Sequence, residues 1–257
     1  MGDAPGTVRA TVQDERSSWT DSLSDMKIDI ISRDAIEYYV RAGKASKRLL
    51  PYFDGDTKHV LEWLCVSDTN DLVAVSAVLL FGKDINRSAT GSFVKIGEFS
   101  DDGKLLREDI VDIPVAMQPD AVMKILFEEY IQRQNGTGKG ITYEYPMAAV
   151  REVLMNAIVH KDYGTFEPVV IKIYPDRMSI SNPGTLPKGW RIGKLRKDHT
   201  SVVRNKNIAD VFYDMGYIDR WGIGIRNLTD SCRKNGNPEP KFSAGRNGIE
   251  VTFYPIR

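Results

Sequence analysis

A carboxylate, an amide and an imidazole recur at intervals of four residues between Tyr145 and Gly164. These side chains belong to Glu152, Asn156 and His160. Because residues four apart share one face of an α-helix, we expect a single polar stripe with apolar residues opposite it. Such a carboxylate can orient a water molecule, and an amide oxygen can ligate Mg²⁺. The alternative is a solvated helix face that has no chemical role.

A second chemical motif consists of closely spaced glycines at the start of a predicted helix. Gly222 and Gly224 stand one residue apart in the segment Trp221–Ile225. Glycines there let backbone N–H groups approach a phosphate, and the helix dipole favours the negative charge. Two glycines at this spacing are, by themselves, weak evidence for a phosphate site.

The elements that must position these motifs are predicted by their patterns. Val169–Tyr174 and Arg177–Ser181 are rich in β-branched residues and predict a hairpin that ends at Asn182-Pro183-Gly184. We expect Asn205 to cap the helix that follows it. The other predicted elements are helices at Arg33–Lys47, Thr57–Val66, Asp120–Gln134 and Asn205–Met215, and strands at Val73–Phe81, Ser92–Phe99, Lys241–Ser243 and Gly248–Tyr254. This mixture predicts an α+β protein.

The order of these motifs resembles the GHKL ATPases, which include gyrase, histidine kinases and MutL. The resembling parts are the helix with Glu152 and Asn156, the strand end Asn182-x-Gly184, a long lid, and Gly222-x-Gly224. The resemblance implies a Bergerat-like α/β sandwich, in which helices cover a mixed, mostly antiparallel sheet. A small helical subdomain would precede it.

The resemblance also implies roles for individual residues in binding ATP and Mg²⁺. Asn156 would ligate the metal and Glu152 would position the attacking water. Asn182 and Gly184 would contact the base edge, and Gly222 and Gly224 would receive the phosphates. Further phosphate candidates are the basic residues His160, Lys161 and Arg204. As alternatives, His160 would stabilise the C-terminus of its helix, and Lys161 would be an ordinary surface lysine.

A further set of motifs consists of AVSAVLLFGKD (74–84), REVLMNAIVHKDY (151–163), SNPGTLP (181–187), RNKNIADVFYDMGYIDRWGIGI (204–225) and NPEPKF (237–242). With these motifs, residues 26–257 resemble the C-terminal region of bacterial and archaeal transcriptional regulators labelled RecG-related. The Schlafen-related, AlbA-type domain that usually precedes this region is not seen. We therefore expect a flexible segment over residues 1–25, a helical subdomain over 26–70 and a nucleotide-binding domain over 71–257. DNA would be contacted through a missing or separate domain, and the chain could form a homodimer.

Departures from the GHKL pattern support a second hypothesis. Asn182 replaces the aspartate that accepts a hydrogen bond from adenine, and Leu186 and Arg226 replace later glycines. An amide oxygen can still accept a hydrogen bond, but an amide carries no charge. The alternative is a degenerate, non-catalytic scaffold for dimerisation or DNA-linked regulation. A histidine-kinase-like phosphotransferase is a third class, for which no phosphoacceptor helix is seen.

The region between the hairpin and the helix after Asn205 contains a basic cluster. Phosphate capture by a closing lid, a nucleic-acid contact and a solvated loop are all compatible with it. Trp190 beside the cluster could stack on a base, whereas Trp221 is expected in the core. The cluster comprises Lys188, Arg191, Lys194, Arg196, Lys197, Arg204 and Lys206.

Composition excludes several classes of protein. Lys plus Arg and Asp plus Glu each total 35 of 257 residues, so no net charge draws the chain to DNA or anionic membranes. Cys65 and Cys232 lack metal-like spacing, which indicates reduced thiols and a cytoplasmic protein. The longest apolar run is too short to span a bilayer. Gly136–Gly140 lacks the residues of a P-loop, so the chain is not expected to be a P-loop helicase.

Overall fold

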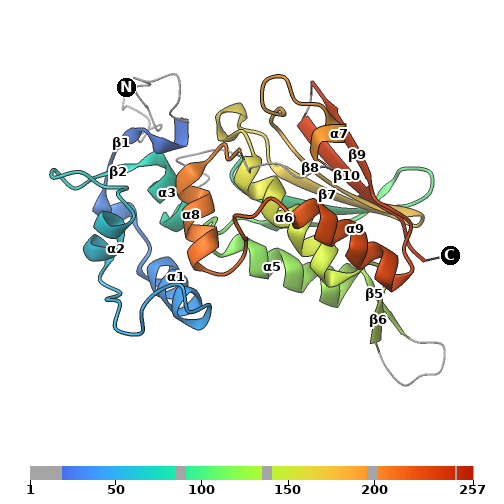
Figure 1. The fold of residues 1–257 in the computed structure, drawn as a ribbon, viewed down its shortest axis with the longest axis horizontal. Helices are drawn as coiled ribbons and strands as arrows, with labels where there is room; N and C mark the ends of the chain where they lie inside the picture. The colour runs from blue at the N-terminus through green and yellow to red at the C-terminus, as the bar shows by residue number, and fades with distance from the viewer. Residues whose placement is uncertain (1–18, 85–90, 135–140, 196–201, 247, 257) are drawn as a thin grey trace.

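The chain forms a group of short helices beside a six-stranded sheet, and further helices lie on one face of that sheet (Figure 1). The computed structural model describes residues 19–84, 91–134, 141–195, 202–246 and 248–256. The predicted α+β fold is confirmed, because the sheet is mixed and packs against helices.

The sheet has the strand order β4-β3-β7-β8-β10-β9. Neighbouring strands are antiparallel except β3 and β7, which are parallel with Val94 opposite Val169. Because parallel neighbours need a crossover connection, the chain between β3 and β7 includes β4 and two of the helices that cover the sheet. The strands are β3 (Val94–Phe99), β4 (Leu105–Val111), β7 (Val169–Tyr174), β8 (Arg177–Asn182), β9 (Lys241–Gly245) and β10 (Gly248–Phe253).

Three helices lie on one face of this sheet. They are α5 (Gln118–Ile125), α6 (Met147–His160) and α9 (Gly224–Asn235). In α6 the predicted apolar residues are buried except Met147, which is 49% exposed in the first turn. On β7 the buried residues Val169, Ile171 and Ile173 alternate with more exposed ones, as expected for a strand with one covered face.

The N-terminal group contains more β-structure than the sequence predicts. Residues 19–25, which the sequence assigns to the flexible segment, form the short helix η1 (Trp19–Asp21) and the start of β1 (Leu23–Lys27), a strand paired with β2 (Leu72–Ala74). The other elements of this group are η2 (Ile28–Ile30), α1 (Arg33–Ala45), α2 (Thr57–Trp63) and α3 (Val75–Phe81).

The predicted strand at Val73–Phe81 is wrong. Only its first residues belong to β2, and the rest form α3, in which every residue is buried. A continuous apolar run has no periodicity that distinguishes a buried strand from a buried helix. The sequence therefore located a core element there but not its type.

The chain between these groups also differs from prediction in one helix. The helix expected to reach Gln134 consists of α5 followed by a π-helical turn, η3 (Leu126–Tyr130), and the chain then enters a short hairpin. The glycine-rich Gly136–Gly140 lies outside the described residues. The remaining elements are β5 (Gln132–Gln134), β6 (Ile141–Tyr143), η4 (Tyr163–Thr165), α7 (Ile192–Leu195) and α8 (Lys206–Asp214).

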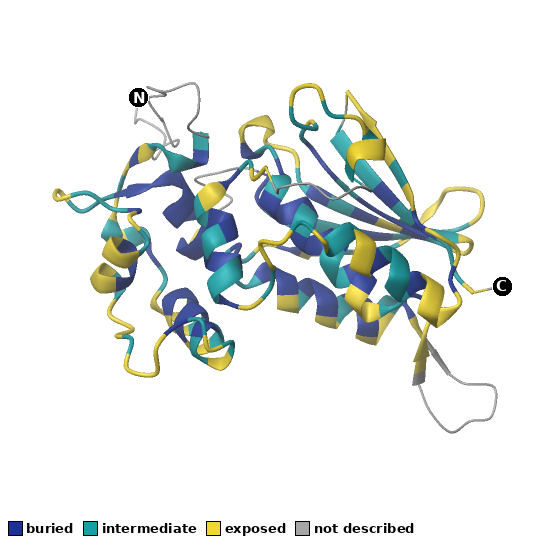
Figure 2. Ribbon diagram, viewed as in Figure 1, coloured by how far each residue is buried: buried dark blue, intermediate teal, exposed yellow. Residues whose placement is uncertain are grey.

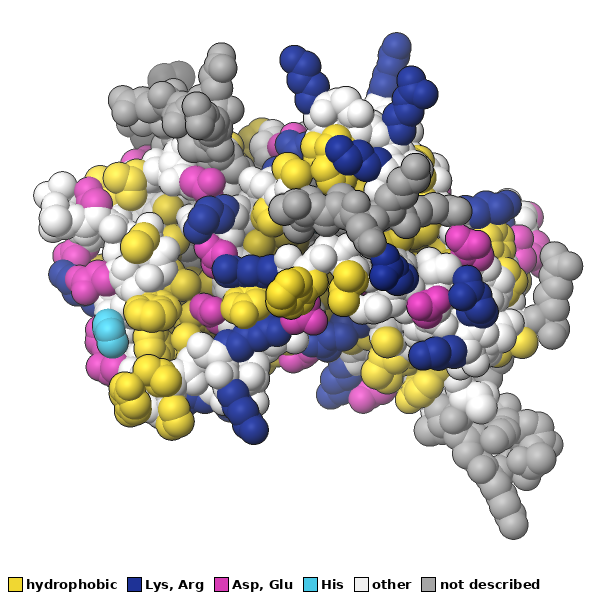
Figure 3. Space-filling view, viewed as in Figure 1, with side chains coloured by type: hydrophobic (Ala, Val, Ile, Leu, Met, Phe, Trp, Pro, Cys, Tyr) yellow, Lys and Arg dark blue, Asp and Glu magenta, His cyan; other side chains and the backbone are white. Residues whose placement is uncertain are grey.

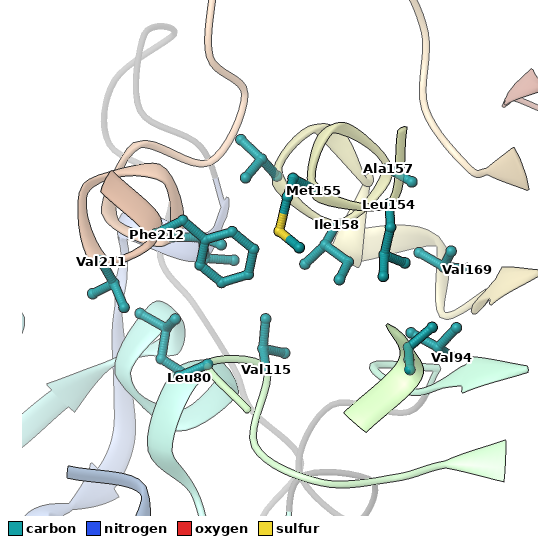
Figure 4. Close-up of a cluster of buried hydrophobic side chains, with 14 of the residues drawn as sticks. Leu80, Val94, Val115, Leu154, Met155, Ala157, Ile158, Val169, Val211 and Phe212 are labelled. Carbon is teal, nitrogen blue, oxygen red and sulfur yellow. The ribbon is translucent and has the colours of Figure 1, made fainter. Parts of the chain in front are cut away.

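A single hydrophobic core joins the two parts of the molecule. Figure 2 shows buried residues both in the N-terminal helices and in the sheet, and these residues belong to one hydrophobic cluster. Figure 4 shows Phe212 of α8 facing Met155 of α6, with Leu80 of α3 below them. Although α8 is late in the sequence, it therefore packs with the early helices α1 and α3. None of the described residues belongs to a helix long and apolar enough to cross a membrane.

Candidate functional site

A cleft of about 400 Å³ lies between α6, the end of β8, the segment that follows β8, and the start of α9. The sheet closes its inner side through residues of β8, β9 and β10. Most of the predicted site residues line this one cleft, although they come from separate parts of the sequence. They are Glu152, Asn156, His160, Asn182, Arg204, Gly222 and Gly224.

The polar stripe of α6 faces the cleft as a hydrogen-bonded pair. Asn156 Nδ2 donates to Glu152 Oε1 at 2.8 Å and to the Glu152 backbone carbonyl at 2.9 Å. Because both bonds use the amide nitrogen, the Asn156 Oδ1 keeps its acceptor capacity. The pair thus combines an oriented carboxylate with an amide oxygen at the same wall.

The Glu152 carboxylate lies directly against the first residue of α9. A methyl group added at Gly224 would lie 1.8 Å from Glu152 Oε1 and 2.6 Å from its carboxyl carbon. Any larger residue would therefore displace the carboxylate. The second glycine of the predicted pair is required here by close approach, whereas Gly222 adopts a positive φ of 67°.

Burial raises the pKa of the Glu152 carboxyl, because the charged form loses hydration. The hydrogen bond from Asn156 opposes this effect, and the negative charge of Asp219 adds to it. Asp219 also lines the cleft. A carboxylate with a raised pKa is a better proton acceptor at neutral pH than an ordinary surface glutamate.

The end of β8 forms another wall of the cleft. Asn182 is buried, and its Nδ2 donates to the Pro183 carbonyl at 3.1 Å. Gly184 does not line the cleft, but its φ of 138° is unfavourable for other residues, and a methyl group there would lie 3.0 Å from the His160 carbonyl. Gly184 therefore lets the chain turn past the end of α6.

The lid region begins at Thr185 and returns to the site at Arg204. Arg204 Nη2 donates to the Thr185 carbonyl at 3.1 Å, and Nη1 lies 3.4 Å from Asp162 Oδ2. This arginine therefore connects the two ends of the lid to the end of α6. Lys194 lies 4.2 Å from the centre of the Trp190 ring, and Figure 3 shows several Lys and Arg side chains projecting from the end that carries α7. Arg196 and Lys197 lie outside the described residues.

Asn205 does not cap α8 with its side chain, so that prediction is wrong. Its Nδ2 instead donates to the carbonyls of Val159 and Lys161, both at 2.8 Å, and its Oδ1 accepts from Thr20 Oγ1 at 3.1 Å. Carbonyls at the end of a helix lack partners within the helix, so this buried amide satisfies the end of α6.

Lys161 is buried rather than exposed, so the surface-lysine alternative is wrong. Its side chain is not part of the cleft lining. The Nζ atom has no hydrogen-bond partner among the described residues and lies 4.2 Å from the centre of the Tyr163 ring. Burial lowers the pKa of Lys161 to about 8, with opposing effects from Asp162 and Glu167.

Sequence reasoning missed the apolar walls of the cleft and the loop before the glycines. Phe242, Ile249 and Val251 reach the cleft from the last hairpin, and Tyr217 and Asp219 reach it from the loop. The alternation in the last hairpin could have indicated a covered face, but the loop has no periodic pattern. Trp221, predicted to pack in the core, is 81% exposed.

The cleft residues fit a nucleotide with Mg²⁺. The volume of the cleft lies within the range of small-molecule sites, roughly 300–1,000 Å³. Apolar walls can hold a base, and the glycine-containing start of α9 can receive phosphates. The protein offers one amide oxygen and one carboxylate, which suits a cation that keeps waters and phosphates as its other ligands.

A comparison with protein families gives a match for the C-terminal part of the chain. Residues 167–253 match the family described as "Putative ATP-dependent DNA helicase recG C-terminal". The chain is therefore similar to this family over about a third of its length. The match extends from just before β7 through the lid and α9 to the end of β10, and α6 with Glu152 and Asn156 lies before it.

A solved structure shares the fold of nearly the whole chain. It is the crystal structure of the DIP2311 protein from Corynebacterium diphtheriae, with a TM-score of 0.71 and 18% sequence identity. The similarity covers 94% of this chain and 40% of that protein, so the chain spans less than half of its length. No curated protein matches the sequence. At this identity the similarity shows the fold alone.

Proposed function

We propose that the chain is the ATP-binding, GHKL-like part of a RecG-related transcriptional regulator, in which ATP with Mg²⁺ changes the conformation and is hydrolysed slowly. The observation that carries this proposal is the hydrogen-bonded pair of Glu152 and Asn156, placed against Gly224 across one cleft. The family match over residues 167–253 supports an ATPase-like domain.

In this proposal the walls of the cleft have separate tasks. Asn182 accepts a hydrogen bond from the base, and the apolar residues of β8 and β10 pack against the ring. The N–H groups at the start of α9 bind phosphate. Of the basic candidates, His160 and Arg204 line the cleft and Lys161 does not. Gly184 acts from behind the wall, where it lets the chain pass the end of α6.

Glu152 is the residue that would act on water. Its raised pKa and its fixed orientation allow it to hold a water molecule and accept a proton from it. Asn156 would hold Mg²⁺ through Oδ1, and the bound ion would neutralise phosphate charge. Because Asn156 also orients Glu152, both tasks depend on the same amide.

Nucleotide occupancy would be transmitted through the lid. Arg204 bonds to Thr185 at the other end of the lid and to Asp162 at the end of α6. A phosphate that competes for this guanidinium would change both contacts at once. We propose that this rearrangement alters pairing with a second copy of the chain in the cytoplasm, or with DNA through a separate domain.

Calorimetry with ATP and Mg²⁺ tests the proposal. The wild-type protein should bind, and Asn156→Ala should bind at least about tenfold more weakly, because the variant loses both the ligand oxygen and the orientation of Glu152. Lys172→Met is the control for a substitution on the surface away from the cleft, because Lys172 is exposed on β7. Equal affinities for wild type and Asn156→Ala, or no binding by either, would refute the proposal.

The alternative is a non-catalytic scaffold, and one observation favours it. Asn182, Leu186 and Arg226 replace the aspartate and glycines of the resembling family. The scaffold predicts an unfolding temperature that does not respond to ATP, ADP or GTP, with or without Mg²⁺. A ligand that binds only the folded state must raise that temperature, so the same series of melts separates the two functions.

A further inference from the structure

The loop Met215–Asp219 leads from α8 toward the glycine pair, and its residues from Gly216 onward line the cleft. Loops are the parts of a fold with the most freedom to move, so a site built on one needs contacts that hold it. The structure places several of these contacts in the N-terminal region, outside the proposed nucleotide-binding domain.

Arg48, in the connection between α1 and α2, contacts both the last turn of α8 and this loop. Its Nη1 donates to the carbonyls of Tyr213 and Ile218, the latter at 2.8 Å, and its Nη2 donates to Asp219 Oδ1 at 2.6 Å. The guanidinium carbon lies 4.0 Å from the centre of the Tyr213 ring. A planar guanidinium combines a rigid fork of donors with stacking on an aromatic ring, and a lysine ammonium has neither feature.

Neighbouring residues of the same N-terminal region contact Asp214, the last residue of α8, and Gly216 of the loop. Ser46 Oγ donates to the Asp214 carbonyl at 2.6 Å, and Tyr39 OH donates to Asp214 Oδ2 at 2.7 Å. Gly216, with a φ of 77°, approaches so closely that a methyl group there would lie 2.9 Å from Ser46 Cβ. The N-terminal region therefore contacts the end of α8 and the loop, while Tyr217 of the loop also donates to Asp120 Oδ2 at 2.8 Å.

We propose that Arg48 is a positioning residue for the nucleotide cleft, which makes the N-terminal helices part of the binding site rather than a separate module. This inference rests on the proposed nucleotide-binding function. Arg48 does not line the cleft and acts through Tyr213, Ile218 and Asp219. When ATP binds, a loop already held in place loses less conformational freedom, and the affinity is higher.

The experiment compares Arg48→Met with Arg33→Met in two measurements. Arg33 also belongs to this region, but it forms an exposed ion pair with Glu37 within α1. Without nucleotide, hydrogen exchange at residues 216–225 should accelerate at least about tenfold in Arg48→Met and stay unchanged in the control. The ATP–Mg²⁺ affinity should fall roughly three- to thirtyfold in Arg48→Met only.

Two further variants keep the test decisive if Arg48→Met does not fold. Arg48→Lys retains the charge without the fork, and Asp219→Asn retains the shape of the partner without its charge. Both should show intermediate acceleration of exchange at 216–225 and an intermediate loss of affinity. Folded variants with wild-type exchange there, or with exchange that accelerates only in α1 and α2, would overturn the inference.

The two measurements also separate this inference from the proposed function. If the wild-type protein binds no nucleotide, the proposed function fails, and the inference about a nucleotide site fails with it, whatever the exchange data show. If the wild-type protein binds ATP and Arg48→Met binds it equally well, only the positioning role fails.

Discussion

Two ionisable side chains are buried in different surroundings, one on the cleft face of α6 and the other just after the C-terminal end of that helix. At the cleft, Glu152 is bonded to Asn156 and borders a space large enough for a ligand. Past the end of the helix, Lys161 is buried with an amine that contacts the Tyr163 ring but has no hydrogen-bond partner among the described residues. A buried charge costs stability in both places, but only beside the cleft does the arrangement offer a function in return.

The largest effect is expected from Gly224→Ala. The added methyl group would overlap the Glu152 carboxylate and force that side chain or α9 to move. We expect loss of measurable ATP binding and a decrease in the free energy of unfolding of about 2 kcal/mol. Calorimetry and urea unfolding provide these values. Gly55→Ala is the matched control, since a methyl group there meets nothing within 4 Å. Unchanged binding by Gly224→Ala would show that the carboxylate position is unimportant.

Glu152→Gln should separate chemistry from stability. Glutamine can still accept the bond from Asn156, so ATP should bind, while steady-state hydrolysis should fall roughly a hundredfold because the proton acceptor is lost. Burial raises the pKa of the Glu152 carboxyl above its ordinary value of 4.5. The free energy of unfolding of the wild type therefore falls as the pH rises from 4.5 through the raised pKa, because the folded state holds its proton longer than the unfolded state. The variant should therefore be more stable than the wild type at pH 7, and the difference should vanish in acid. Equal turnover, or lower stability at pH 7, would contradict this prediction.

Lys161→Met should change stability only. The pKa of Lys161 falls from 10.5 to about 8, so below pH 8 the folded protein carries a charge that burial penalises. The contribution of this lysine to stability rises between pH 8 and pH 10.5, because the unfolded state then binds more protons than the folded state. We expect Lys161→Met to raise the free energy of unfolding at pH 7 by about 2 kcal/mol and to flatten that pH dependence.

The control for this change is Lys172→Met, because Lys172 is exposed on β7. Urea unfolding from pH 7 to pH 10.5 measures both variants. ATP affinity should remain at the wild-type level in Lys161→Met, because Lys161 lies outside the cleft lining. A large loss of affinity would show instead that the amine serves the nucleotide site, and the contrast between the two sites would disappear.

Local patterns in the sequence predicted the elements that carry the site. The helix with Glu152 and Asn156, the hairpin that ends at Asn182, and the helix that begins at Gly224 are all present, and they meet at one cleft. Each of these has either helical periodicity or a turn signal, and the order of the motifs supplied the rest through a family resemblance.

Features that depend on tertiary contacts could not be predicted in the same way. The all-apolar run that forms α3 has no period, and the bonds of Asn205 reach residues that are distant in the sequence. Lys161 looks like any polar residue at the end of a helix until the packing around it is known. The role proposed for Arg48 depends on contacts with distant parts of the sequence. Its bond to the Tyr213 carbonyl joins residues that are 165 positions apart.

The packing of α8 against α1 and α3 has a consequence for folding during synthesis. The early helices emerge from the ribosome long before Lys206–Asp214, and their apolar surfaces stay uncovered until that helix is made. At translation rates of about 5–20 residues per second, the nascent chain would therefore expose this apolar surface for many seconds. Chaperone capture in this interval, or aggregation when it is prolonged, is the expected cost of closing an early core with a late helix.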